Sequence, residues 1–498
     1  MVCLSMKKHT KTMPMLPGFY LPKRGRKSRT PQQVFAARLA SIKAKTFKQI
    51  GEIFSPFVPI DTLRQEQAGA MSRRRIFTKE NTFWAFLSQC LDADGGCKEV
   101  VRKLQSYASM RGLGMPSSST ASYCTARKKL NEDTLSRIFC HTARWAGAPN
   151  ESGALNGRRV IVVDGTGVSM PDTAENQAVW PQLSSQKAGC GFPTARICAY
   201  FALGNGGMLN YAIGNKKCHE LPLFRENWST FDKGDIFLGD KGFCSYFDIA
   251  KLKDRGVDSV VTLARRKPAS KRNCLKELGP DDLLVEWKKP PYNKILSYSK
   301  DAWEELPDRL VMRQIKVQVN QPGFRCKEFY IVTTLLDPNT YLSTEIAALY
   351  RKRWDVELFL RDIKTTMGFD ILRCQSPEMI RKEVLMKFIA YNCTRRLIFE
   401  AADVENIAVM RTISFKGSLQ AIRSWESRMG DSQLGQRERF FMMADLYLAM
   451  AQCRVSDRPG RSEPRCLKRR PKPFQLLTRP RHEMKEIQHR NRYQLKTA

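Results

Sequence analysis

The sequence predicts an α/β protein in which a sheet with flanking helices follows a helical N-terminal region. From about residue 32 to residue 146 apolar residues recur with helical spacing, as in ENTFWAFLSQCL at residues 80–91. From Arg159 onward the pattern changes to short apolar runs that end at glycine or aspartate, which is typical of buried strands. Helical runs then alternate with further strands, and this alternation favours an α/β fold.

Composition and charge point to a polyanionic partner. The chain has 498 residues, enough for several domains, and 84 Lys and Arg against 49 Asp and Glu give a net charge of +35. Such an excess favours a nucleic acid, bound through phosphate contacts and counterion release. A content of 42% hydrophobic residues argues against a mostly disordered basic protein.

Cysteine spacing and hydropathy indicate the cellular compartment of the protein. The 15 cysteines are scattered without a CxxC pair, so we expect reduced thiols rather than a zinc module or disulfide framework. The sequence contains no signal-peptide pattern and no apolar run approaching the roughly 18 residues of a membrane helix. We therefore expect a cytoplasmic protein that associates with the nucleoid when it binds DNA.

The N-terminal third predicts a DNA-binding region. Residues 1–34 are basic and contain proline and glycine, which favours a flexible arm, and residues 35–150 predict a helical DNA-binding domain. The serine-rich run MPSSST at residues 115–120 offers N-caps for a helix that carries Arg127, Lys128 and Lys129. Short helices around a polar turn, with a basic second helix, are similar to a helix-turn-helix.

Residues 155–264 predict the first part of a catalytic core. RRVIVVDGT is a strand that we expect to end at Asp164, and residues 195–203 and 208–214 predict a hairpin through GNGG. A helix near residues 220–230, a strand that ends at Asp240, a helix at 245–255 and a strand at 258–264 follow. This order, with a carboxylate after the first and fourth strands, predicts a ribonuclease H-like fold.

The rest of the chain completes and extends this core. Residues 265–340 predict a β-rich insertion, and residues 341–400 predict the second part of the core, including a helix near residues 379–400. Residues 401–453 predict C-terminal helices that could serve in dimerisation, including one near 437–450. Residues 454–498, rich in proline and arginine, predict a basic, extended tail.

The run YRKRWDVELFLRDIK at residues 350–364 predicts a functional helix face. Tyr350, Arg353, Glu357 and Lys364 are spaced so that they fall within about 60° of one another on one helix. One carboxylate beside two cations and a phenol suits a surface that holds a nucleic-acid backbone near a metal ion. The alternative is a solvated helix face with an ordinary ion pair between Arg353 and Glu357.

Three acids from distant parts of the sequence form the candidate catalytic set. Asp164, Asp240 and Glu357 could together hold two Mg²⁺ ions, or Mn²⁺ in their place, for in-line displacement at phosphorus. The alternative for each aspartate is a residue that caps a turn. Asp172 follows Asp164 closely, but it lacks a preceding apolar strand and ranks second.

These residues resemble the insertion-sequence-4 family of DDE transposases. The family signature Y-x2-R-x3-E-x6-K fits Tyr350, Arg353, Glu357 and Lys364 without gaps, and VVDGTGVSMPDTAENQ and FLGDKGF are similar to the segments around its two aspartates. The resemblance implies excision and integration of a DNA element through a nick, a hairpin and strand transfer, by a homodimer on the element's terminal inverted repeats and target DNA. It also implies an aromatic residue in the insertion that stacks on a flipped base. Phe329 or Tyr330 is the nearest match, with Trp287 and Trp303 as further aromatic residues of the insertion.

Two other functions remain open from the sequence. A metal-dependent nuclease of the same fold would share the three acids but would not need Tyr350, Arg353 and Lys364 together. A catalytically inactive or domesticated DNA-binding protein would need none of the acids, and all three are present.

Overall fold

The computed structural model describes residues 49–65, 67–72, 76–92, 94–110, 115–148, 154–215, 219–263, 268–293, 297–318, 328–407, 412–429, 435–455 and 476–484. The chain divides into two compact units, Met1–Lys45 with Gln105–Pro116, and Thr46–Leu104 with Ser117–Ala498. The predicted arm, residues 1–34, lies outside the described residues, as does most of the predicted tail. No helix within the described ranges is long and apolar enough to cross a membrane.

Helices form the N-terminal region, as predicted. They are α2 (Gln49–Phe54), α3 (Lys79–Leu91), α4 (Cys97–Met110), α5 (Ala121–Lys129) and α6 (Glu132–Ala146), with 3-10 turns at Ser55–Phe57 and Ile60–Leu63. The Thr78 hydroxyl caps α3 by accepting a hydrogen bond from the Asn81 N–H at 3.2 Å. Before α5, the Ser119 hydroxyl accepts from the Ala121 N–H at 3.3 Å, so the serine-rich run does satisfy an N–H group at this helix start.

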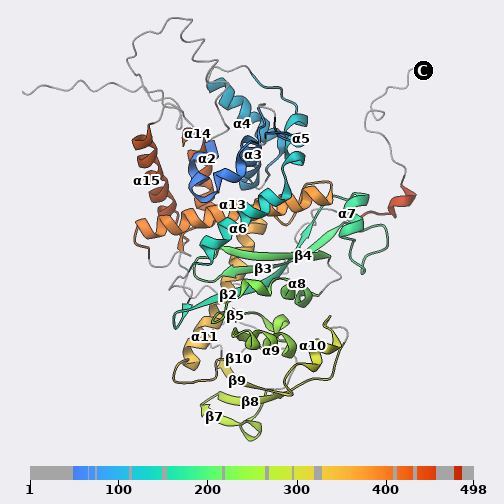
Figure 1. The fold of residues 1–498 in the computed structure, drawn as a ribbon, viewed down its shortest axis with the longest axis vertical. Coiled ribbons are helices and arrows are strands. Elements are labelled where there is room, and N and C mark those ends of the chain that lie inside the picture. The colour runs from blue at the N-terminus through green and yellow to red at the C-terminus, as the bar shows by residue number, and fades with distance from the viewer. Residues whose placement is uncertain are drawn as a thin grey trace, which may run out of the picture. The chain divides into compact units, whose positions relative to one another are not determined.

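A mixed sheet forms the centre of the second unit (Figure 1). Its strand order is β4-β3-β2-β5-β6-β10-β9-β8-β7, and the short β1 pairs with β2. The bounds are β1 (Ala154–Leu155), β2 (Arg158–Ser169), β3 (Thr194–Ala202), β4 (Met208–Asn215), β5 (Ile236–Leu238), β6 (Asp258–Thr262), β7 (Lys276–Gly279), β8 (Asp282–Lys288), β9 (Arg309–Gln318) and β10 (Glu328–Thr333).

Strands β2 to β6 have the order and directions that the ribonuclease H-like prediction requires. β2, β3 and β4 pair antiparallel, whereas β5 pairs parallel with both β2 and β6. The hairpin between β3 and β4 turns at Gly206, whose φ of +68° favours glycine. Helices α8 (Glu220–Glu226) and α9 (Tyr246–Asp254) follow β4 and β5, so the predicted order of strands and helices is confirmed. A short helix, α7 (Ala174–Val179), lies between β2 and β3 and was not predicted.

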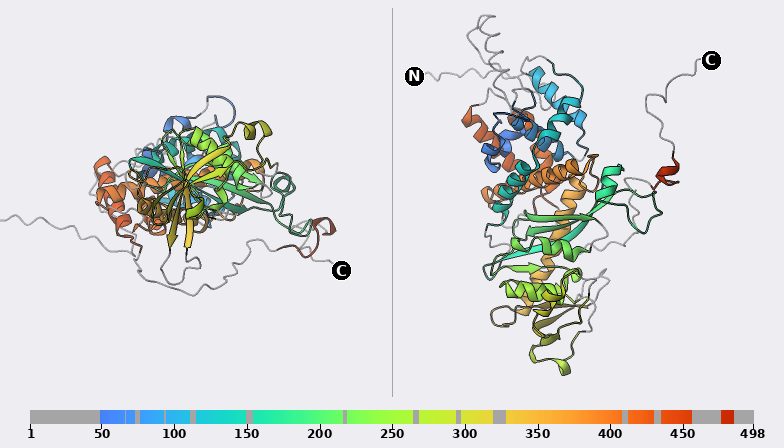
Figure 2. Two further views of the ribbon diagram at one scale, coloured as in Figure 1. Left: turned by 90° about the horizontal axis from the view of Figure 1, so that it is seen from below. Right: turned by 45° about the vertical axis from the view of Figure 1, so that its right-hand side comes forward.

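The strands of the predicted β-rich insertion continue this same sheet. β10 pairs antiparallel with β6 and with β9, and β9 pairs with β8. Figure 2 shows the continuous run of strands from other sides. The helix α10 (Lys300–Glu304) lies in the chain between β8 and β9. The sequence predicted a β-rich segment here, but it could not show that its strands extend the central sheet.

Strand alternation divides the apolar core between the two faces of the sheet. In β2, Val160 and Val162 belong to one buried cluster, and Ile161 and Val163 belong to the other. The first cluster also contains the apolar residues of α12 and α13, and the second contains those of α8 and α9. Helices therefore cover both faces of the sheet at β2.

The C-terminal part supplies the remaining helices. They are α11 (Ser343–Lys352), α12 (Trp354–Arg361), the π-helical turn η8 (Asp362–Thr366), α13 (Pro377–Val404), α14 (Phe415–Met429), α15 (Gln436–Gln452) and a 3-10 turn at Arg481–Glu483. The long helix α13 is almost entirely buried. It contacts the β3–β4 hairpin, because the Asn392 amide bonds both backbone groups of Met208 and the Tyr391 hydroxyl donates to the Gly206 carbonyl at 2.6 Å.

Candidate active site

Asp164 lies on β2, immediately beyond the part of the strand that pairs with β5. The parallel pairing covers Val160 to Val162, and Asp164 pairs only with Ala199 of β3. Its Oδ1 accepts a hydrogen bond from the Gly165 N–H at 2.8 Å. The prediction that the strand ends at Asp164 is wrong: β2 continues to Ser169, because β3 offers backbone partners along its whole length.

Asp240 follows β5 by two residues and begins a 3-10 turn, η5 (Lys241–Phe243). Its Oδ1 accepts from the Gly242 N–H at 2.7 Å, so this carboxylate does cap a turn. Because β2 and β5 are adjacent and parallel, residues that follow their paired segments lie at the same edge of the sheet. Asp240 can therefore cap its turn and still lie beside Asp164.

The charge of Asp240 affects the pKa of Asp164. The pKa of Asp164 is raised to about 6, mainly by burial and in smaller part by the negative charges of Asp240 and Glu220. The Gly165 N–H and the Arg353 guanidinium act in the opposite direction. Asp164 thus lies in a partly buried site where negative charge accumulates.

The predicted single helix face is interrupted. α11 ends at Lys352, α12 begins at Trp354, and Lys364 lies on the π-helical turn η8. The four signature residues therefore do not form one stripe on a continuous helix, since a 3.6-residue period holds only within an unbroken α-helix. The side chains differ in exposure as well: Tyr350 is buried, Arg353 and Lys364 are half-buried, and Glu357 is exposed.

Tyr350 packs against the sheet next to the candidate site. Its hydroxyl lies 2.9 Å from Thr262 Oγ1 on β6, and either oxygen can be the donor. Its ring packs on Phe329 of β10, with centroids 5.5 Å apart. Tyr350 therefore connects α11 to the two strands at the centre of the sheet.

Arg353 lies near Glu357 and close enough to Asp164 for its charge to act on that carboxylate. Arg353 Nη2 lies 3.5 Å from Glu357 Oε1, with side-chain exposures of 11% and 45%. This is the i,i+4 pair of the alternative interpretation, yet Arg353 also lowers the pKa of Asp164 from a different element. The Arg353 Nε is buried without a hydrogen-bond partner, which marks a donor that the protein itself leaves unused.

Asp164, Asp240 and Glu357 carry the oxygen ligands that hard cations prefer, but their side chains are not close enough together in the structure to form a metal site. Within the described ranges, no group of three or more His, Cys, Asp or Glu side chains is close enough to hold a metal ion. Carboxylate oxygens are the ligands that Mg²⁺ and Mn²⁺ prefer, and the repulsion between Asp164 and Asp240 is what a cation would relieve. Asp164 and Asp240 fit such an ion, whereas Glu357 would first have to leave Arg353.

Other predicted candidates have different surroundings. Asp172 forms an ion pair with Arg481 and accepts a hydrogen bond from the Gln177 side chain, so it serves the packing of residues 476–484. Phe329 packs against Tyr350, while Tyr330 is the next residue of β10 and points to the other face. The two tryptophans of the insertion pack into the second core cluster, Trp287 as a buried residue and Trp303 at its margin.

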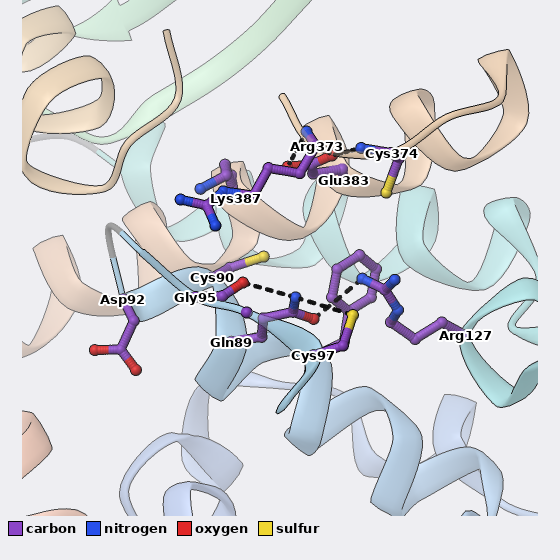
Figure 3. Close-up of a pocket in the computed structure, with 12 residues that line it drawn as sticks. Gln89, Cys90, Asp92, Gly95, Cys97, Arg127, Arg373, Cys374, Glu383 and Lys387 are labelled. Atoms are coloured by element: carbon purple, nitrogen blue, oxygen red, sulfur yellow. Dashed lines mark hydrogen bonds between the residues drawn. The ribbon is translucent and has the colours of Figure 1, made fainter. Parts of the chain in front are cut away.

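Arg127 differs in its surroundings from the other basic residues of α5. Although Lys128 and Lys129 are exposed, Arg127 is only 8% exposed and packs 5.0 Å from the Phe86 ring centroid. Its Nη1 donates to Gln89 Oε1 at 3.1 Å, and it lines a pocket between α3, α4 and α13 (Figure 3). Of the three basic residues named for this predicted helix, Arg127 is therefore part of the protein interior, and Lys128 and Lys129 are exposed.

Glu220, which was not among the predicted site residues, lies close to the aspartates. It begins α8, and its Oε1 lies 2.5 Å from the position that a Cβ on Gly165 would take. Its Oε2 lies 3.8 Å from the corresponding position on Gly242, in the turn capped by Asp240. The only sequence signal was the run of glycines after each aspartate, which permits a close approach.

Comparisons with known proteins show which families and relatives this chain is similar to. The family model described as Transposase DDE domain matches residues 155–393, and Insertion element 4 transposase N-terminal matches residues 46–140. The chain is similar to transposase InsG for insertion sequence element IS4 of Escherichia coli, with 24% identity over 425 residues, 85% of this chain and 92% of the relative. It is also similar to a piggyBac transposase in a synaptic complex with hairpin DNA, at 13% identity and a TM-score of 0.39, covering 84% of this chain and 86% of that one.

Proposed function

Because the chain belongs to the insertion-sequence-4 family of DDE transposases, we propose that it excises and integrates a DNA element by metal-dependent phosphoryl transfer. The observation that carries this proposal is the placement of Asp164 and Asp240 beyond the paired ends of two adjacent parallel strands. The helix with Arg353 and Glu357 packs on the same face of β2 as the Asp164 side chain. Acids from three distant segments thus approach one edge of the sheet.

Asp164, Asp240 and Glu357 are proposed to hold two divalent cations, Mg²⁺ or Mn²⁺. When bound, such ions would activate the attacking oxygen and stabilise charge on the leaving oxygen of an in-line displacement. The chain's own contribution is to fix the carboxylates. The N–H groups of Gly165 and Gly242 hold one oxygen of each aspartate, which leaves the other oxygen available.

The proposed reaction sequence uses the same site for every step. Water attacks phosphorus at the element end, and the 3′-oxygen leaves as a 3′-hydroxyl. This hydroxyl attacks the opposite strand, which forms a hairpin and releases the flanking DNA. Water reopens the hairpin, and the 3′-hydroxyl ends then attack target DNA, each displacing a 3′-oxygen of the target.

Arg353, Lys364 and Tyr350 are proposed to contact DNA phosphates around the scissile bond. Arg353 is suited because its guanidinium lies near both Glu357 and Asp164 and carries the charge that a phosphate pairs with. Tyr350 can contribute if Thr262 donates to it, because the phenolic hydrogen is then available. We also propose that Phe329 or Tyr330 stacks on a flipped base, and Phe329 is the better placed because it packs on Tyr350.

The binding partners follow from the same family. We propose that the chain binds the terminal inverted repeats of its element and target DNA, and works as a homodimer in the synaptic complex. The net charge of +35 supports contact with long stretches of phosphate backbone. The exposed cations of α5, Lys128 and Lys129, are the described residues of the predicted DNA-binding region that we expect to contribute.

A cleavage assay on an element end tests the proposal against its two alternatives. Asp164→Ala, Asp240→Ala and Glu357→Ala should each abolish nicking, hairpin formation and strand transfer while end binding is kept. Asp172→Ala is the matched control and should remain active, since its carboxylate pairs with Arg481 instead. Wild-type cleavage by any of the three variants would exclude the site, nicks without strand transfer would indicate a nuclease, and binding without cleavage by the wild type would indicate an inactive protein.

A further inference from the structure

We propose that the pocket between α3, α4 and α13 binds one phosphate group, either as the free ion or as part of a DNA strand. The pocket has a volume of about 100 Å³, several times the roughly 10–15 Å³ that a single water needs. None of the residues that line it belongs to the candidate active site. The inference is therefore independent of the proposed metal ions.

Arg127 gives the pocket a buried cation whose donors are mostly unused. The residue is 8% exposed, and of its three side-chain nitrogens only Nη1 has an acceptor among the described residues, Gln89 Oε1 at 3.1 Å. The Nε atom is buried without a hydrogen-bond partner. Figure 3 shows the guanidinium beside Gln89 and Cys97 at the wall of the pocket. A planar guanidinium with free donors is the group that recognises phosphate by paired hydrogen bonds.

Lys387 adds a second buried cation. It is 5% exposed, and its Nζ donates to the Met367 carbonyl oxygen at 2.6 Å, which uses one of three donors. Within the described ranges neither Lys387 nor Arg127 forms an ion pair with a carboxylate. The pKa of the Cys90 thiol is raised to about 12, mainly by burial, and the positive charges of Lys387 and Arg127 oppose that rise. Both cations therefore act on one thiol of the pocket wall.

The carboxylates of the pocket do not neutralise these two cations. Asp92 forms ion pairs with Lys103 at 3.2 Å and with Arg423 at 2.7 Å. Glu383 is buried, and its Oε2 accepts hydrogen bonds from two backbone N–H groups at 3.0 Å each. Two buried cations thus lie beside one buried carboxylate that the backbone already holds. An anion in the pocket would relieve this excess of positive charge.

The start of α4 adds backbone donors to the same wall. Gly96 and Cys97 line the pocket, and the N–H groups of a first helical turn have no partner within the helix. The helix dipole favours an anion at this end. Gln89 connects this wall to Arg127, because its Nε2 donates to the Gly95 carbonyl oxygen at 2.8 Å while its Oε1 accepts from Arg127. A Cβ on Gly95 would overlap the Gln89 carbonyl oxygen, so this approach requires glycine.

Equilibrium dialysis of radiolabelled inorganic phosphate against the full-length protein, at constant ionic strength in chloride, tests the proposal. The wild type should show one saturable site. Arg127→Met should weaken it about 10- to 100-fold, the cost of one charged hydrogen-bond partner, and Arg127→Lys should weaken it less. Arg137→Gln removes an exposed arginine of α6 outside the pocket and is the matched control. Absence of a saturable site, or equal weakening by Arg137→Gln, would assign the binding to general charge and overturn the inference.

A measurement on the wild type keeps the test decisive if the Arg127 variants do not fold. Cys97 lines the pocket and is half-buried, whereas Cys140 is exposed on α6 outside it. Phosphate should slow alkylation of Cys97 by a thiol reagent, in proportion to the occupancy of the site, and should leave the rate at Cys140 unchanged. Peptide mapping by mass spectrometry measures both rates. An unchanged rate at Cys97, or equal slowing of both thiols, would contradict the proposal.

Competition with DNA distinguishes the two sources of the phosphate group. A short DNA duplex that displaces the labelled phosphate from the wild type would show that the pocket holds a phosphate of the strand. Simultaneous binding of duplex and labelled phosphate would show that it holds the free ion. Failure of the pocket to bind phosphate in these assays would leave the proposed active site unaffected, because the two sites share no residue.

Discussion

A buried ion pair holds the segment that carries Lys364 onto helix α13. Arg395 Nη2 lies 2.6 Å from Asp362 Oδ2, and the two side chains are 4% and 13% exposed. The guanidinium also packs 4.9 Å from the Phe359 ring centroid. Loss of the arginine would leave a buried carboxylate without its partner, which costs about 3–5 kcal/mol. We therefore expect Arg395→Met to lower the free energy of unfolding by this amount.

The pH dependence of this loss has a definite sign. Burial raises the pKa of Asp362, and the positive charges of Arg395 and Arg361 oppose that rise. Without Arg395 the folded-state pKa rises further above the unfolded value, so the charged carboxylate destabilises the fold mainly at high pH. As the pH falls through the folded-state pKa, Asp362 takes up a proton and the loss diminishes.

Urea unfolding, followed by tryptophan fluorescence at about pH 8 and about pH 5.5, measures this loss. Arg395→Met should be less destabilised at the lower pH. The double variant Asp362→Asn/Arg395→Met removes both charges and should recover most of the loss. A loss below about 1 kcal/mol at the higher pH, or an equal loss at both, would refute the reasoning.

Three further predictions follow from the site and the charge. Arg353→Ala and Lys364→Ala should slow hairpin formation and opening more than the first nick, by about 10- to 100-fold for each lost charged contact; equal slowing of all steps in a gel time course would contradict this. Tyr350→Phe should cost about 1 kcal/mol of stability through the lost Thr262 bond, seen as a lower thermal midpoint. Deletion of residues 1–34 and 454–498 should flatten the plot of log affinity against log salt for non-cognate DNA, and an unchanged slope would assign the charge elsewhere.

The fold was largely predictable because its signals are local. The apolar run of β2, the hairpin at Gly206 and the helix α13 each follow from hydrophobic period and turn residues. The end of β2 was mispredicted because a polar residue normally ends a buried strand, and here β3 continues the pairing past Asp164. The pairing between β6 and β10 joins strands that are far apart in the sequence, and the hydrophobic period within each strand does not show which strands pair.

The site was predictable in its residues and less so in its geometry. The spacing of Arg353 and Glu357 identified an ion pair that the structure contains. The break after Lys352 was not signalled, because neither glycine nor proline marks it. Glu220 was not predicted near the site because its approach to Gly165 is a tertiary contact, which has no sequence spacing of its own.

The most direct test of the central claim is a change of metal preference. Asp164→Cys, Asp240→Cys and Glu357→Cys would each replace a carboxylate oxygen by sulfur, which Mg²⁺ binds poorly and the softer Mn²⁺ tolerates better. Cleavage of a labelled element end should be lost with Mg²⁺ and restored in part with Mn²⁺ for each variant. Undiminished cleavage with Mg²⁺, or no difference between the two metals in all three variants, would contradict a metal site built from these acids.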